Sequence, residues 1–264
     1  MKRAFFNLQI GPDRPHWDTC LKTQHTYCKK YNIDHYISRK PFINYKWCPP
    51  HGKIYFEKLQ CLSLLDKGYD QVLMIDCDVL ITPDAENIFD KYTDLDKIYA
   101  YDENQTVGIM GDTLYGEKED IMDRDPYIRR IIKNVKEPFE WRKNHRDKYR
   151  FYNTGVFMFG KNTASIFKNN DKFHSLVNTK NIYDFWEQTY ISSIIQKYDI
   201  PNESIDYSFN RMNLGKRDEH NERYDANFIH YAGPCLYNIP TPLEFTEQRR
   251  VDAIFKDYNN LYEL

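Results

Sequence analysis

The sequence contains no apolar run long enough to cross a membrane, no internal repeat and no low-complexity segment. A membrane-spanning helix needs about 20 predominantly apolar residues. The net charge is only −2 at pH 7, so the chain lacks the basic surplus that nucleic-acid-binding proteins use to neutralise phosphates. These absences predict a globular protein with no transmembrane segment and no nucleic-acid partner.

The cysteines do not follow the paired spacing of a zinc site. They are Cys20, Cys28, Cys48, Cys61, Cys77 and Cys235. The first eight residues become polar too early for a secretory signal, and a disulfide framework is uncommon in a chain of 264 residues. We therefore expect reduced thiols and a cytoplasmic protein.

Segments with strand-like and helix-like spacing alternate along the chain, which predicts a single α/β domain over residues 1–264. The expected strands cover residues 4–10, 35–38, 71–81, 97–102, 151–160 and 227–232. The expected helices cover residues 17–31, 55–67, 162–178 and 184–197, with a short helical segment opening at 82–84. Residues 104–150 are charged and irregular; they are either an insertion that carries specificity for a partner molecule or a plain surface excursion.

The most informative segment is Val72–Ile81, an apolar run interrupted by Asp76 and Asp78. Such a run predicts a strand buried on both faces, where an unpaired carboxylate is very costly. Ligands of open α/β sheets bind at the carboxyl ends of strands, and side chains at i and i+2 of a strand share a face. Both carboxylates would then reach one divalent cation. The alternative is a pair of carboxylates at a strand-to-turn junction that are solvated or cap the next helix.

Several weaker motifs lie around this segment, and their order is more specific than any one of them. They are Lys58–Leu64, Tyr69–Leu80, Asn87–Asp90, Tyr152–Phe157, Asp184–Gln188, Ile205–Asn210 and Phe228–Gly233. Together they resemble the GT-A glycosyltransferases, most closely the family-8 group that includes glycogenin and bacterial galactosyl- and glucosyltransferases. The resemblance covers roughly residues 55–102 and 150–235.

The resemblance implies a single GT-A domain, which is a Rossmann-like mixed sheet flanked by helices. It implies a metal-dependent enzyme that transfers a hexose from a nucleoside-diphosphate sugar, with a UDP-sugar as the favoured donor, and retains the anomeric configuration. The acceptor would be a glycan, a protein or a lipid, and residues 104–150 would lie on its side. The cofactor would be Mn²⁺ or Mg²⁺, which bridges the diphosphate of the donor.

The same resemblance assigns roles to individual residues. The metal ligands would be Asp76, Asp78 and His230, and the catalytic candidates are Asp184 and Gln188, which are i and i+4 on a helix. The donor-binding set is Leu8, Lys58, Asp76, Cys77, Asn153, Glu187 and Gly233. Without the resemblance, Lys58 would be interpreted as an ordinary exposed helix lysine and His230 as a structural histidine.

Two positions depart from the family pattern. Glu187 stands where the family usually has Asp, and Leu236 stands where the family has a Lys that contacts the diphosphate. We hypothesise that Lys216 or Arg217, in a charged loop, or an arginine of the 104–150 insertion supplies the missing cation.

Two other classes of function compete with the enzyme. The first is a GT-A domain that binds a sugar nucleotide without turning it over, which the loss of the Lys favours. The second is a HAD-type phosphatase, which also has an Asp-x-Asp after an apolar strand, with the first Asp as nucleophile. That motif strand normally comes first in the chain, and here a strand–helix–strand unit precedes it. The sequence does not indicate the sugar, the acceptor or the oligomeric state.

Overall fold

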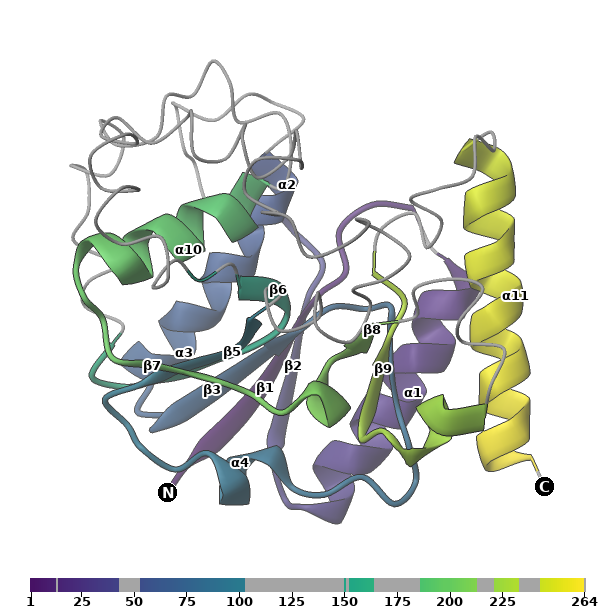
Figure 1. Cartoon of the computed structure of the whole chain (residues 1–264), viewed down its shortest axis with the longest axis horizontal. Helices are drawn as coiled ribbons and strands as arrows, with labels where there is room; N and C mark the ends of the chain where they lie inside the picture. The colour runs from purple at the N-terminus through teal and green to yellow at the C-terminus, as the bar shows by residue number, and fades with distance from the viewer. Residues whose placement is uncertain are drawn as a thin grey trace, which may run out of the picture.

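The computed structural model describes residues 1–12, 14–42, 53–102, 150, 152–163, 186–212, 221–232 and 243–263. Within these residues, the main sheet has six strands in the order β2-β1-β3-β6-β5-β7. Their bounds are β2 (Asp34–Ser38), β1 (Arg3–Leu8), β3 (Gln71–Ile75), β6 (Tyr152–Gly160), β5 (Ile98–Asp102) and β7 (Asn202–Ser204). β1 runs parallel to β2 and β3, whereas β6 runs antiparallel to both β3 and β5, so the sheet is mixed (Figure 1).

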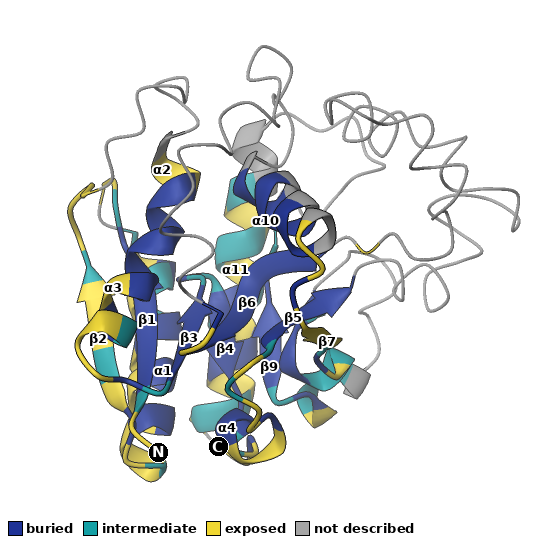
Figure 2. Ribbon diagram, turned by 90° about the vertical axis from the view of Figure 1, so that its left-hand side faces the viewer, coloured by how far each residue is buried: buried dark blue, intermediate teal, exposed yellow. Residues whose placement is uncertain are grey.

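The centre of the sheet is buried on both faces, as the apolar runs of the sequence predict. Every residue of β3 and of β6 is buried, and β2 at the edge is mostly exposed or intermediate (Figure 2). Strands covered on both faces read as continuous apolar runs rather than as alternating patterns. The carboxyl end of β3 is therefore the place where the buried core gives way to polar residues.

The expected single strand over residues 71–81 is wrong. The chain forms β3, leaves the main sheet at Asp76 and enters β4 (Val79–Ile81) of a second sheet, ordered β4-β9-β8. The other strands of that sheet are β9 (Phe228–His230) and β8 (Arg211–Met212). The cause is the polar turn itself, in which the amide of Val79 donates to the carbonyl of Asp76 at 3.3 Å. The motif thus lies at the junction of two sheets.

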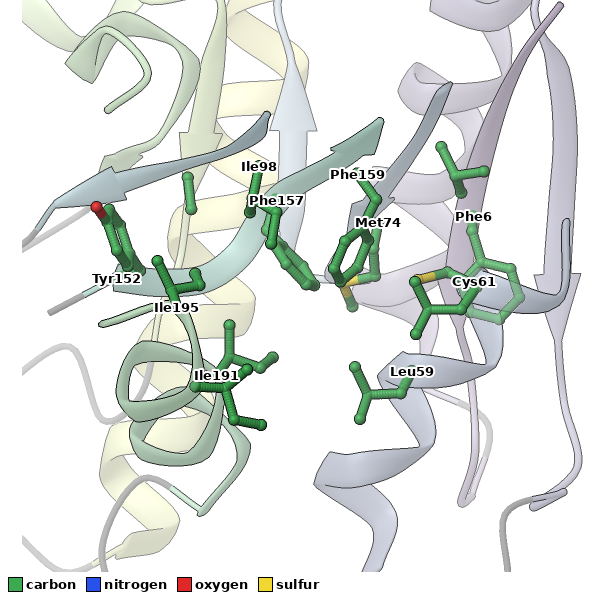
Figure 3. Close-up of a cluster of buried hydrophobic side chains, with 14 of the residues drawn as sticks. Phe6, Leu59, Cys61, Met74, Ile98, Tyr152, Phe157, Phe159, Ile191 and Ile195 are labelled. Atoms are coloured by element: carbon green, nitrogen blue, oxygen red, sulfur yellow. The ribbon is translucent and has the colours of Figure 1, made fainter. Parts of the chain in front are cut away.

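One face of the main sheet is covered by short helical segments and by α10 (Trp186–Lys197). The helix expected over residues 55–67 is present as three consecutive pieces, α2 (Lys53–Phe56), η1 (Glu57–Cys61) and α3 (Leu62–Asp66). Figure 3 shows the core between these helices and the sheet, in which Phe157 and Phe159 pack with ring centroids 4.2 Å apart. This core fixes η1 and α10 beside the carboxyl end of β3.

The other face is covered by α1 (Pro15–Lys30), by the small sheet and by α4 (Ile88–Lys91). The short turns η4 (Tyr207–Phe209) and η6 (Asn221–Asp225) lead into β8 and β9. α11 (Leu243–Tyr262) lies beside α1 at the outside (Figure 1). A third apolar cluster, which includes Cys20, Leu80, Ile229 and Ile254, joins α1, the small sheet and α11.

The remaining expectations have mixed outcomes. α1, β1, β2, β5, β6, α10 and β9 lie where helices and strands were expected, within a few residues at each end. The short helix expected to open at residues 82–84 begins instead at Ile88, because the side chain of Asn87 caps it by accepting from the amide of Phe89 at 3.2 Å. α11 was not expected. Almost all of the helix expected at residues 162–178 and of the insertion at 104–150 falls outside the described residues.

Within the described residues, no helix is both long and apolar enough to span a bilayer. Among the described residues, Cys20, Cys28, Cys61 and Cys77 are buried free thiols. The cytoplasmic location and the domain bounds stay predictions.

Candidate functional site

The turn between β3 and β4 is held in place from two sides. The amide of Asp76 donates to the carbonyl of Gly155 in β6 at 2.8 Å. From α1, the Nε2 of the buried Gln24 donates to the carbonyl of Asp76 at 3.0 Å and to that of Val79 at 2.7 Å. Gln24 in turn accepts from the side-chain amide of Asn7 in β1 at 2.7 Å. Because its carbonyls are anchored, the turn presents the two carboxylates in a defined geometry.

Asp76, Asp78 and His230 come together, as the sequence predicted, although a turn rather than a strand aligns the two carboxylates. One ligand atom from each lies within 4.8 Å of the others. The Nε2 of His230 is 3.9 Å from Oδ2 of Asp76 and 3.6 Å from Oδ1 of Asp78. That Oδ1 is buried and has no hydrogen-bond partner among the described residues. A buried anionic oxygen without a donor is costly, and a hard divalent cation would satisfy it. Two carboxylates and an imidazole fit Mn²⁺ or Mg²⁺.

His230 can occupy its position only because residue 155 is a glycine. β9 carries His230 toward the main sheet, where its ring lies against Gly155 of β6. A Cβ added to Gly155 would lie 1.9 Å from Cε1 and 2.5 Å from Nε2 of the imidazole. Real Cβ atoms do not approach other atoms so closely. The glycine in the Tyr152–Phe157 motif therefore leaves the space that the imidazole of His230 occupies.

Hydrogen bonds fix the tautomer of His230. The amide of Gly155 can only donate, and it donates to Oδ1 of Asn153 at 2.9 Å. The same Oδ1 accepts from Nδ2 of Asn210 at 3.0 Å, so the Oδ1 of Asn210 faces Nδ1 of His230, at 2.8 Å. The Nδ1 must then carry the proton, which leaves the Nε2 lone pair directed at the two carboxylates. Such outer partners orient histidine ligands in metal sites.

The protonation state of His230 also suits a ligand. Burial lowers the pKa of His230 below its usual value, and this effect outweighs Asp78 and Asp76, which raise it. The imidazole is therefore neutral near pH 7, and neutral imidazole is the form that binds metals.

Lys58 is buried and bridges two carboxylates. From η1 its Nζ lies 2.9 Å from Oδ2 of Asp76 and 2.8 Å from Oε1 of Glu187 on α10. Burial opposes the charge on Lys58, but the two carboxylates outweigh it and raise the pKa of the amine above its usual value. The same Oε1 of Glu187 accepts from the hydroxyl of Thr154 at 2.8 Å. Lys58 is thus no exposed helix lysine; it joins the metal-ligand candidates to α10.

One basic residue of the site was not predicted. Arg250, on α11, places Nη1 3.3 Å from Oδ2 of Asp78 and Nη2 3.5 Å from Glu247 one turn earlier. The Nη1 of Arg14, which precedes α1, lies 2.6 Å from Glu247. No motif marks Arg250 in the sequence. The only available signal was a basic residue on an amphipathic helix, which is usually solvated.

The other predicted residues are partly accounted for. The thiol of Cys77 donates to the carbonyl of Leu8 at the end of β1 at 3.2 Å, so both lie beside the turn. Gln188 is buried on α10, next to Glu187. Asn153 contacts Asn210 and Gly155, as described above. Leu236, which departs from the family pattern, lies outside the described part of the chain, and so do four predicted site residues. They are Asp184, Lys216, Arg217 and Gly233.

Comparison with known proteins gives a result only for structure. No protein-family model and no curated protein sequence matches the chain. The chain is similar to a glycosyltransferase involved in the glycosylation of the major capsid of PBCV-1, with a TM-score of 0.57, 14% identity, and coverage of 96% of this chain and 99% of that one. It is also similar to the galactosyltransferase LgtC in complex with donor and acceptor sugar analogues, with a TM-score of 0.55, 13% identity, and coverage of 98% and 96%.

At these identities the matches establish the fold. The chain has the GT-A fold of glycosyltransferases over nearly its full length, and the α/β fold class and the resemblance seen in the sequence are confirmed at that level. The match removes the basis for the phosphatase alternative, which required a different topology around the Asp-x-Asp strand. Fold does not by itself assign an activity.

Proposed function

We propose that the protein is a metal-dependent glycosyltransferase that transfers a hexose from a nucleoside-diphosphate sugar, with a UDP-sugar as the first choice, to a glycan, protein or lipid acceptor with retention of configuration. The observation that carries the proposal is the group formed by Asp76, Asp78 and His230 at the carboxyl end of β3. This is where ligands bind in open α/β sheets. The GT-A fold of the relatives supports the same function.

Asp76, Asp78 and His230 would hold Mn²⁺ or Mg²⁺, which when bound neutralises negative charge on the leaving diphosphate. The chain's own residues supply positioning. Gln24 and Gly155 hold the turn backbone, and Lys58 ties Asp76 to Glu187 on α10. The ion pair keeps α10 beside the metal-ligand candidates, so that Gln188, one residue on, is kept close to the reacting sugar.

Gln188 is the catalytic candidate that the structure describes. It is 7% exposed and lies one residue after Glu187, the partner of Lys58. Its amide carries both donor and acceptor atoms, which sugar hydroxyls require. Asp184, four residues earlier in the sequence, is the second candidate, with a proposed place behind the anomeric centre.

The deciding experiment measures nucleoside diphosphate released from a panel of UDP-, GDP- and dTDP-sugars, with and without Mn²⁺. We expect Mn²⁺-dependent release from one donor by the wild type and loss of that release in Asp78→Ala. Arg249→Ala is a suitable control, because Arg249 is exposed on α11 next to the site. Release that is independent of Mn²⁺, or that survives Asp78→Ala, would contradict the proposal.

The non-catalytic alternative has a distinct signature in the same panel. A binding domain would take up one nucleotide sugar in calorimetry and release no nucleoside diphosphate, with or without added acceptor. The orphaned Oδ1 of Asp78 does not distinguish the two, because both need the ion.

A further inference from the structure

The two oxygens of Asp78 face different partners. Oδ1 is buried, has no hydrogen-bond partner in the part of the chain that the structure describes, and lies 3.6 Å from Nε2 of His230. Oδ2 lies 3.3 Å from Nη1 of Arg250. A cation held between Asp78 and His230 would therefore use Oδ1 and leave the contact with Arg250 intact. The guanidinium is a neighbour of the ion rather than a competitor for its ligand atom.

Arg250 is held at this position by its own helix and by α1. Glu247, one turn earlier on α11, contacts both Nη2 of Arg250 and Nη1 of Arg14. α11 packs along α1, which also carries the Gln24 that anchors the turn (Figure 1). The side chain of Arg250 is 16% exposed, so a ligand from solvent can still reach it. A fixed guanidinium loses little freedom when it binds a ligand.

The charge of the site calls for an anionic ligand once the ion is present. Each carboxylate of the turn has its own cation, Lys58 on Asp76 and Arg250 on Asp78. Among the described residues, the ion pairs of Lys58, Arg250 and Glu247 join four carboxylates to three basic side chains. They are Asp76, Asp78, Glu187 and Glu247 against Lys58, Arg14 and Arg250. A divalent cation therefore turns the group from net negative to net positive.

We infer that Arg250 binds the diphosphate of the nucleotide-sugar donor. The inference rests on the function proposed above. A divalent ion held by Asp78 would bind phosphate oxygens and so draw the diphosphate toward the carboxylate that Arg250 contacts. The guanidinium is permanently charged and carries five N–H donors, so it can donate to phosphate oxygens in addition to its carboxylate contacts. The charge that builds up on the leaving group is then shared between the ion and a side chain from α11.

This assignment changes the sequence-based hypothesis. Lys216 and Arg217 were the predicted replacements for the Lys that Leu236 displaces, and they lie outside the described residues. Arg250 does lie in the described part of the chain, and its guanidinium contacts Asp78, the second carboxylate of the Asp-x-Asp motif.

The test is calorimetric binding of UDP and of UMP in the presence of Mn²⁺, and of Mn²⁺ alone, to the wild type, Arg250→Ala and Arg250→Lys. The matched control is Arg249→Ala, which removes the same charge from the exposed face of the same helix. We expect Arg250→Ala to weaken UDP binding about 10- to 100-fold, the scale of a charge-assisted hydrogen bond, and UMP binding by a smaller factor. Arg250→Lys should recover part of the loss, because it restores the charge but not the fork.

The binding of Mn²⁺ alone separates this role from a purely structural one. If Arg250 binds diphosphate, Arg250→Ala retains Mn²⁺ affinity or gains some, since a neighbouring positive charge is removed. Equal losses of Mn²⁺ and UDP affinity would mean that Arg250 only orients Asp78, and unchanged UDP affinity would mean that it does not touch the diphosphate; either result overturns the inference. A wild type that binds Mn²⁺ but no nucleoside diphosphate would instead refute the proposed function, and the inference with it.

Discussion

Replacing Gly155 by alanine tests the geometry of the candidate metal site with a single methyl group. The added Cβ would lie 1.9 Å from Cε1 and 2.7 Å from Nδ1 of His230. Non-bonded carbon atoms settle at about 3.5 Å or more, so the ring must move by about 1.6 Å. Protein metal sites tolerate ligand displacements of about 0.2 Å. The imidazole is therefore lost as a ligand, although its sequence position is unchanged.

The expected change in Mn²⁺ affinity follows from the loss of the imidazole as a ligand. Disturbing an outer partner of a metal ligand already costs about 10- to 100-fold in metal affinity, and displacing the ligand itself costs at least the upper end. We expect the dissociation constant for Mn²⁺ to rise by about 100-fold or more. Overpacking should also lower the free energy of unfolding by about 1–3 kcal/mol. The change in stability alone would not identify the site.

The assay is Mn²⁺ titration followed by electron paramagnetic resonance, in which free and bound ions are counted directly. Gly160→Ala is the matched control: its Cβ would meet the backbone of Leu95 at 2.2 Å, at the other end of β6 from the candidate ligands. It should destabilise the protein without changing Mn²⁺ affinity. Wild-type Mn²⁺ affinity in a folded Gly155→Ala protein would refute the assignment of His230 as a ligand.

Three further predictions concern the partners of the site and the sheet edge. Asn210→Ala should raise the dissociation constant for Mn²⁺ about 10- to 100-fold and shift the ¹⁵N resonances of His230 toward a mixture of tautomers; unchanged resonances would contradict the hydrogen-bond chain. Lys58→Met should lower the free energy of unfolding in urea by about 3–5 kcal/mol because it leaves Glu187 buried and unpaired, and adding Glu187→Gln should restore part of it; additive losses would argue against the pair. Burial, followed by the charge of His25, lowers the pKa of His35 to about 4, so below pH 6.5 the unfolded chain binds a proton that the folded chain does not. Stability should fall by up to about 3 kcal/mol between pH 6.5 and 4, and in His35→Gln the slope should be shallower by that amount; parallel pH profiles would refute it.

The sequence predicted the fold well where apolar runs are long. β3 and β6 read as strands because both are buried on both faces, and α1 and α10 read as helices from their spacing. The break of the run at Asp76 was missed, because Val79, Leu80 and Ile81 are as apolar as the strand before them. Which sheet a short apolar segment joins depends on tertiary pairing, here with β9.

The residues of the candidate site also fall into those that the sequence predicted and those that it did not. Asp76 and Asp78 were predicted from the interrupted apolar run and His230 from the resemblance, and the structure brings the three within reach of one ion. Gly155 leaves room for the imidazole and Asn210 hydrogen-bonds to it. Neither role could be predicted from the sequence, because both depend on which segments pack together. Arg250 carries no local signal, since its contact with Asp78 joins residues 172 positions apart.

The wide spacing of these contacts has a consequence for how the protein matures. β1, β3, β6 and β5 can pair as soon as residue 160 has been synthesised, and domains generally begin to fold from the N-terminal side during synthesis. The imidazole arrives only with residue 230 and the guanidinium with residue 250. A ligand of this site therefore cannot template the early sheet on the ribosome. A cation on the proposed ligands Asp76, Asp78 and His230 could stabilise the fold by mass action only after β9 has paired with β4.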